Sequence, residues 1–250
     1  MGSEMCIRDR SCTGAWHAEA DGVGDRALFG RNLAILLGDL AHTTADRLAN
    51  GLPPRLRAEW YALSVELVAG QRADLTGAAA GRRDLAHAER VARLKSGRYT
   101  IERPLQLGAM AAGATEETLA ALSRCGEHVG RAFALRDDYL GVWGDPERTG
   151  KPSGDDLWEA KATVLLTLAR ERLAGDDAAL LDRLGTDGVD RDEVERLAET
   201  MRAAGVAGAV EDLIAAEYAA ALACLQSPSL SSAGAAGIAE AARTIAWRDH

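Results

Sequence analysis

The stretch "TEETLAALSRCGEHVGRAFALRDDYLGVWG", residues 115–144, is a long run with strong helical periodicity. Glu116 and Glu117 stand near its start, where negative side chains favour a first helical turn because they face the positive end of the helix dipole. The pattern therefore predicts one long helix. Its second half carries two adjacent acids, Asp137 and Asp138, where the pattern would place core residues, and these acids bear on function.

Similar patterns predict helices on both sides of this run. Asn50, Gly51 and the two prolines at 53–54 separate the first two of them. Asp84 is a candidate N-cap, and we expect Pro104 to kink or break the helix that contains it. The expected helices cover residues 25–50, 54–77, 84–113, 155–175, 177–184, 190–204, 206–225 and 230–246.

Composition also favours a single all-α domain. The 250 residues are 47% hydrophobic but only 4% aromatic, and few runs alternate apolar with polar residues as strands do. A formal net charge of −9 argues against a nucleic-acid-binding protein, which usually presents a basic face. The four cysteines show no metal-ligand spacing, so we expect free thiols in a reducing cytoplasm. No apolar run is long enough for a membrane span, and the start lacks the form of a signal peptide.

The acids of the long helix point to a metal site. Uncompensated carboxylates beside an apolar face are costly to desolvate, so Asp137 and Asp138 need neutralising partners. Oxygen ligands without His or Cys suit Mg²⁺, which typically takes one or two carboxylates together with substrate phosphates. Lys151 and Lys161 follow at spacings that let them contact phosphate oxygens. Chemistry alone leaves open an equal alternative, a solvated helix end with ion pairs.

Four segments together carry a family resemblance. They are "FGRNLAILLGD" at 29–39, "VAGQRADL" at 68–75, "RLKSGRYTIERPLQLGA" at 93–109 and "LRDDYLGVWGDPERTGKPSGDDL" at 135–157. In this order they resemble segments of the trans-isoprenyl diphosphate synthases, the polyprenyl synthetase family, and the last resembles the second aspartate-rich motif. The resemblance implies a prenyltransferase with an isoprenoid-synthase-type helical bundle around a central cavity.

The resemblance also implies roles for individual residues. They are Asp137 and Asp138 for Mg²⁺; Lys95, Lys151 and Lys161 as catalytic lysines on the allylic diphosphate, with Ser96 at its margin; and Gln71 and Asp74 in the cavity wall. Asp155 or Asp156 is expected to cap the following helix instead of joining the site.

Two departures from the family pattern concern the site. The first Asp-Asp-x-x-Asp motif is absent and would stand just before "SCTGAWH", residues 11–17. The preceding "GSEMCIRDR", residues 2–10, resembles a translated sequencing-library adapter, so we expect residues 1–10 to be foreign and residues 11–250 to be a polyprenyl synthetase domain without its first helices. Gly141 stands where a third aspartate would be, as in a bacterial subset of the family.

The resemblance implies that the intact protein adds isopentenyl diphosphate to an allylic diphosphate, giving a geranylgeranyl- or farnesyl-type product. It also implies a cytoplasmic homodimer. The chain as given is expected to be inactive because half of the metal cage is missing. Two alternatives stay open: a non-catalytic partner of an active synthase, and a class I terpene cyclase.

Overall fold

The computed structural model describes residues 12–82, 84–149, 153–186 and 188–249. Throughout these ranges every regular element is a helix, so the all-α prediction is confirmed. The chain divides into two compact units whose boundary falls between Ala58 and Glu59, and each unit is described by itself. All predicted site residues belong to the second unit.

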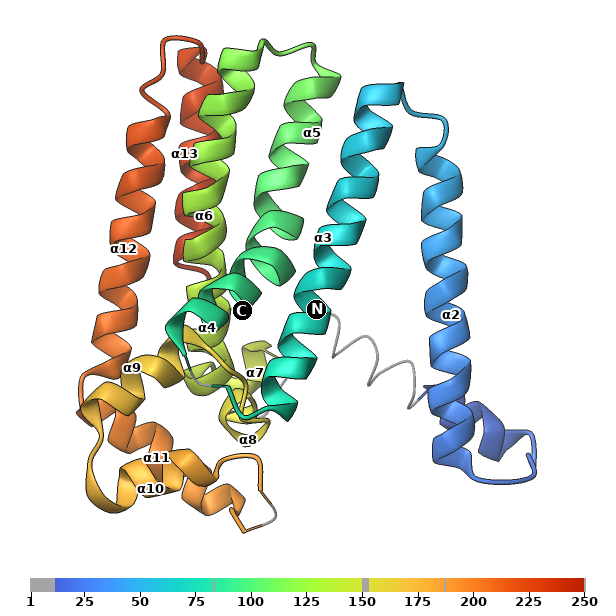
Figure 1. The fold of residues 1–250 in the computed structure, drawn as a ribbon, viewed down its shortest axis with the longest axis vertical. Helices are drawn as coiled ribbons and strands as arrows, with labels where there is room; N and C mark the ends of the chain where they lie inside the picture. The colour runs from blue at the N-terminus through green and yellow to red at the C-terminus, as the bar shows by residue number, and fades with distance from the viewer. Residues whose placement is uncertain (1–11, 83, 150–152, 187, 250) are drawn as a thin grey trace. The chain divides into compact units, whose positions relative to one another are not determined.

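The helices keep the labels of Figure 1. Their bounds are α2 Arg26–Ala49, α3 Pro54–Ala79, α4 Leu85–Val91, the π-helix η1 Ala92–Glu102, α5 Arg103–Ala111, α6 Glu116–Trp143, α7 Pro146–Thr149, α8 Asp155–Trp158, α9 Val164–Arg172, α10 Gly175–Arg183, α11 Arg191–Ala203, α12 Val206–Cys224 and α13 Ser232–Ala246.

Helix α6 is the centre of the second unit. The Thr115 side chain caps it by accepting a hydrogen bond from the Thr118 N–H, and η1, α5, α12 and α13 pack along its length (Figure 1). Gly97 of η1 and Gly130 of α6 meet so closely that a Cβ at position 130 would stand 2.9 Å from the Gly97 Cα. Because only glycine fits, this contact fixes η1, which carries Lys95 and Ser96, against the helix that carries the acids.

The main core lies where α8, α9, α11 and α12 meet the carboxyl-terminal half of α6. Its fully buried side chains include Leu157, Leu165, Leu197, Met201 and Ile214. Burying a side chain of this size contributes roughly 1.5–3 kcal/mol each. The core therefore holds α8 and α9 against the carboxyl-terminal half of α6, which carries Asp137 and Asp138.

The chain near Pro104 stays helical, so the expected break does not occur, and the expected kink stays a prediction. Residues Ala92–Glu102 form a π-helix, and α5 then begins at Arg103 with Pro104 in its first turn. Proline is tolerated in a first turn because its missing N–H would have no partner there. The wider π-helical turn absorbs the disruption, and π-helical turns are frequent at functional sites.

The single helix predicted over residues 155–175 is wrong. The structure divides it into α8 and α9, with Ala160 between them at a φ of +52°. Thr163 begins α9 anew, because its side chain accepts a hydrogen bond from the Leu166 N–H. As a result Lys161 lies in a short loop and not on a helix face.

The first unit contains α2 and the helical stretch at residues 12–19. The Asp25 carboxylate caps α2 by accepting hydrogen bonds from the N–H groups of Ala27 and Leu28. Phe29 packs against the rings of Trp16 and His17. The expectation of a foreign segment at residues 1–10 concerns residues outside the described ranges.

Candidate functional site

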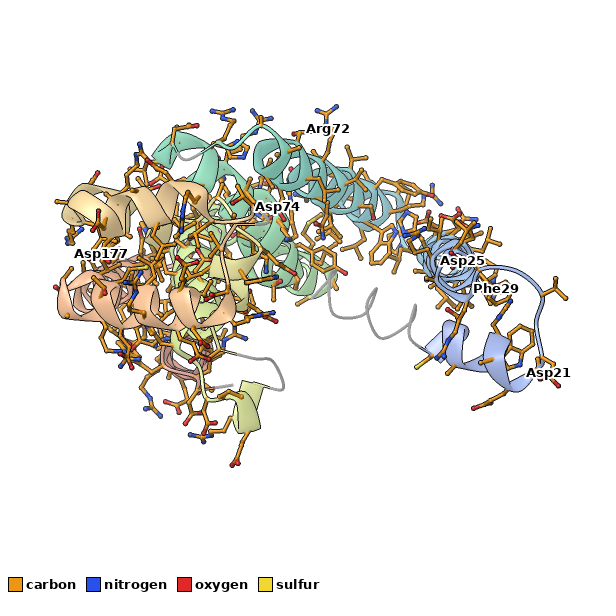
Figure 2. All side chains as sticks on the ribbon, turned by 90° about the horizontal axis from the view of Figure 1, so that it is seen from below. Asp21, Asp25, Phe29, Arg72, Asp74 and Asp177 are labelled. Atoms are coloured by element: carbon orange, nitrogen blue, oxygen red, sulfur yellow. The ribbon has the colours of Figure 1, made fainter. Side chains whose placement is uncertain are left out.

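Lys95 and Asp74, two predicted site residues, form an ion pair. The Lys95 ammonium donates to Asp74 Oδ2 over 2.5 Å, and the two side chains are 23% and 17% exposed. Figure 2 shows Asp74 on α3, where it faces η1, while Arg72, two residues earlier, is exposed. Gln71 lies on α3 three residues before Asp74, and Ser96 follows Lys95 on η1; both side chains are half-buried.

Further ion pairs join α3 to η1 and α5 beyond the pair of Asp74 and Lys95. Glu66 accepts hydrogen bonds from Arg98 of η1 and from Arg103 of α5, each at 2.8 Å or less. Glu66 also raises the pKa of Arg103 further above its ordinary value, and burial opposes this shift. Glu59 adds a second carboxylate at 2.7 Å from Arg103. These ion pairs attach α3 to the π-helix and so hold Asp74 beside Lys95.

Asp138 of α6 is the electrostatic centre of the site. Burial raises the pKa of Asp138 well above its usual range, and the charges of Asp156 and Asp137 raise it further. Lys161 and Lys95 act in the opposite direction by Coulomb attraction. Such interactions require nearby charges, so the fold brings Lys95, Asp156 and Lys161, which belong to separate elements, into the neighbourhood of Asp138.

Asp156 is a member of this cluster that the sequence reasoning missed. An ideal Cβ on Gly141 would lie 2.0 Å from Asp156 Oδ2, so the Asp156 carboxylate fills the space that a side chain at position 141 would need. The signal that could have revealed it was the absence of a third acid at position 141, because a missing side chain leaves room for another.

The prediction that Asp155 or Asp156 caps the next helix is wrong. The N-cap of α8 is Gly154, at a φ of +79° and with no side chain to cap with. Asp155 instead accepts a hydrogen bond from Arg191 at 2.7 Å. Both acids stand in the first turn of α8, where the helix dipole favours negative charge.

Lys161 reaches this cluster from the loop between α8 and α9. Its ammonium forms an ion pair with Asp156 and another with Glu159 at 3.1 Å. Burial is the largest influence on Lys161 and works against its charged form, but the charges and hydrogen bonds of Asp156 and Glu159 together outweigh it, so the pKa of Lys161 is raised. Lys161 is therefore charged at every pH of interest.

Asp137 has a different partner from Asp138. Its Oδ1 accepts a hydrogen bond of 2.8 Å from Nη2 of Arg248, which follows α13. The Asp137 side chain is 53% exposed, so it stays accessible despite this ion pair. The remaining predicted site residue, Lys151, lies outside the described residues.

The carboxylate oxygens of this site suit a hard cation whose other ligands come from the substrate. Among the residues that the structure describes, no three His, Cys, Asp or Glu side chains come close enough to hold a metal ion by themselves. Mg²⁺ does not need such a group, since one or two carboxylates and substrate phosphates complete its shell. Burial is the main cause of the raised pKa of Asp138, and the carboxylates of Asp156 and Asp137 add to it; a divalent cation would neutralise this negative charge.

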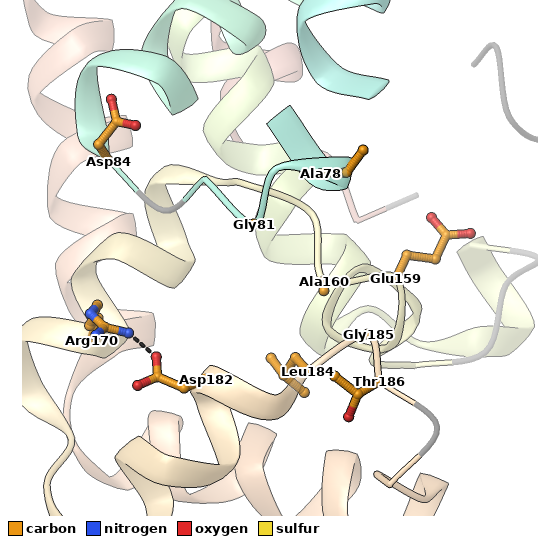
Figure 3. Close-up of a pocket in the computed structure, with 11 residues that line it drawn as sticks. Ala78, Gly81, Asp84, Glu159, Ala160, Arg170, Asp182, Leu184, Gly185 and Thr186 are labelled. Carbon is orange, nitrogen blue, oxygen red and sulfur yellow. Dashed lines mark hydrogen bonds and ion pairs between the residues drawn. The ribbon is translucent and has the colours of Figure 1, made fainter. Parts of the chain in front are cut away.

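A groove in the second unit borders this site through Glu159, which pairs with Lys161. It has a volume of about 770 Å³ and is lined by residues including Ala78, Glu159, Arg170 and Asp182 (Figure 3). Arg170 and Asp182 form an exposed ion pair within it. None of the predicted site residues lines this groove, so the expectation that they line a central cavity stays a prediction.

No helix within the described ranges is both long and apolar enough to cross a membrane.

Comparisons with known proteins agree with the motifs. The chain is 34% identical over 187 residues to geranylgeranyl diphosphate synthase of Mycobacterium tuberculosis, covering 72% of this chain and 53% of that protein. It is 36% identical over 189 residues to (2E,6E)-farnesyl diphosphate synthase of Mycobacterium bovis, covering 72% and 52%. The chain thus spans about half the length of these curated relatives.

A solved structure extends the likeness. The crystal structure of geranylgeranyl pyrophosphate synthase from Corynebacterium glutamicum, complexed with isoprenyl diphosphate and magnesium, matches with a TM-score of 0.90 and 33% identity. The match covers 96% of this chain and 70% of that one. The family model for polyprenyl synthetase matches residues 14–201. The chain therefore belongs to the polyprenyl synthetase family.

Proposed function

We propose that the protein is a Mg²⁺-dependent prenyltransferase that joins isopentenyl diphosphate to an allylic diphosphate. The observation that carries this proposal is the cluster of Asp138, Asp156, Lys95 and Lys161, which α6, α8, η1 and a loop bring together. A diphosphate needs both cations and lysines to balance its charge, and this cluster offers acids for the first and ammonium groups for the second.

In this proposal Asp137 and Asp138 hold the cation. Magnesium, when bound, would supply positive charge to the departing diphosphate. Lys161 and Lys95 would contact the diphosphate oxygens, and Lys95 would exchange its present partner Asp74 for them. Fixed positive charges of this kind stabilise a leaving group because they need no reorganisation during the reaction. Lys151 keeps its predicted role as a lysine on the diphosphate, Ser96 its place at the margin of the diphosphate, and Gln71 its place in the cavity wall.

We further propose that the protein acts as a cytoplasmic homodimer. Helix α3 carries a stripe of exposed apolar side chains, Tyr61, Val65, Val68 and Leu75, each at least 45% exposed. Their spacing of three, four or seven residues places them on one face of the helix. Contiguous exposed apolar surface of this kind supports association, and a second copy of the chain presents the matching stripe.

The function is tested with labelled isopentenyl diphosphate, Mg²⁺ and geranyl or farnesyl diphosphate, using this chain and a version extended by its native upstream sequence. We expect elongation by the extended version, and Asp137→Ala should lower its turnover by roughly 10²-fold, the scale of losing a major electrostatic stabiliser. Asp212→Ala removes an exposed acid of α12 and should leave turnover unchanged. A folded extended protein without any elongation activity would favour a non-catalytic partner subunit.

A further inference from the structure

The segment that follows α13, Trp247–Asp249, is tied to the acid-bearing end of α6. Just before it, the buried Arg136 of α6 donates from Nε to the Ala246 carbonyl oxygen at 2.7 Å. The Trp247 ring then packs edge-on against Tyr218 with ring centroids 4.9 Å apart. These contacts set the direction in which the next residue, Arg248, leaves α13.

Arg248 is held over α6 by two residues that are one helical turn apart. Its guanidinium carbon lies 4.4 Å above the centre of the Phe133 ring, and Nη2 donates to Asp137 Oδ1 at 2.8 Å. The ring face attracts the cation and limits the positions it can take. Nε of Arg248 is buried and has no hydrogen-bond partner among the described residues, so this guanidinium has a donor that its present contacts leave unused.

A second ion pair holds the same segment. Asp249 accepts a contact of 2.7 Å from Arg148 of α7, in the loop that leads from α6 to Lys161. The segment thus spans from α13 to the loop beside the acids. Because Arg148 and Asp249 are each more than half exposed, this second ion pair is weak and can open.

The Arg248–Asp137 pair conflicts with the proposed role of Asp137. A carboxylate oxygen that accepts a hydrogen bond from a permanently charged guanidinium cannot use the same lone pair for a cation. Asp137 is 53% exposed and Arg248 24%, so the ion pair opens to solvent on the carboxylate side, where a divalent cation can approach and displace the guanidinium. Phe133 would keep the released guanidinium close by.

We propose that Arg248 is a reversible guard of the metal-binding carboxylate: it occupies Asp137 in the metal-free protein, and a divalent cation must displace it. This inference rests on the proposed function, since it assumes that Asp137 binds the cation. Without Arg248 the cation no longer competes with an ion pair, so its affinity rises by the strength of that pair, about two- to fivefold for a pair with one exposed partner.

The test measures Mn²⁺ binding to the full chain by electron paramagnetic resonance, without substrate. Arg248→Gln should tighten binding about two- to fivefold. Arg243→Gln, which removes the same charge from an exposed pair with Glu240, should leave binding unchanged. Unchanged or weaker binding in Arg248→Gln would overturn the inference while the metal site itself stands.

A double-mutant cycle separates a direct guard from a long-range charge effect. In an Asp137→Asn background the gain from Arg248→Gln should vanish, because the residue that Arg248 guards is gone. A gain that persists there overturns the inference. If Arg248→Gln does not fold, Arg248→Lys replaces it, and the weaker hold of a lysine on Asp137 should still tighten Mn²⁺ binding. If neither the native chain nor any variant binds Mn²⁺, the proposed metal site fails, and the guard with it.

Discussion

Gly141→Ala tests the contact that places Asp156 in the site. The added methyl group would lie 2.0 Å from Asp156 Oδ2, whereas ordinary contacts begin at 3.4 Å. The Asp156 carboxylate must therefore retreat by more than about 1 Å, and because its other oxygen, Oδ1, pairs with Lys161, we expect this movement to disturb the ion pair. The substitution thus reports on whether this carboxylate really fills the space beside α6.

The expected loss of stability combines two opposing effects. Losing a charge-assisted hydrogen bond costs about 1.5–3 kcal/mol, and Lys161 and Asp156, 24% and 12% exposed, are buried enough for that range to apply. Replacing a helical glycine by alanine returns up to about 1 kcal/mol. With the full return of about 1 kcal/mol, the net destabilisation is about 0.5–2 kcal/mol, which corresponds to a fall in Tm of roughly 1–8 °C for a domain of this size.

Gly237→Ala is the matched control. Gly237 is a helical glycine of α13 with no atom within 4 Å of an added Cβ, so the same substitution should only gain helix propensity and raise Tm by about 2–4 °C. Thermal unfolding followed by circular dichroism measures both variants. If Gly141→Ala raises Tm as much as Gly237→Ala does, the Asp156 carboxylate does not occupy that space.

Two further predictions concern charge and assembly. The pKa of Asp138 is raised above its ordinary value of 3.8, so the native fold loses stability as pH rises from that value toward the raised one. Asp138→Asn should remove this loss and raise Tm at neutral pH, and a series of thermal melts starting near the ordinary value of 3.8 and rising to neutral pH in which the gap between native and variant does not widen would contradict it. Val68→Glu should weaken self-association roughly tenfold or more in sedimentation equilibrium, because it buries an unpaired charge in the proposed interface. Leu213→Glu on α12 is the control and should leave self-association unchanged. An unchanged dimer in Val68→Glu would mean that the α3 stripe is not the interface.

Most of the fold follows from local pattern. The helical period, the Asp84 cap and the separator at residues 50–54 predict helices that the structure confirms within a few residues. The break between α8 and α9 could not be predicted, because it depends on Ala160 at a positive φ. Nothing in an alanine signals that conformation, and only the packing of neighbouring core residues over-determines it.

The candidate site, like the fold, follows partly from the sequence and partly from the tertiary structure. The sequence by itself determined which residue types carry the chemistry, since acids in an apolar run and spaced lysines are visible without coordinates. Only the tertiary structure decided that Asp156 replaces a side chain missing at Gly141, and that Arg248 pairs with Asp137 across 111 residues. The physical reason is that a charge finds its partner by distance in space, and sequence spacing reports that distance only within a single helix.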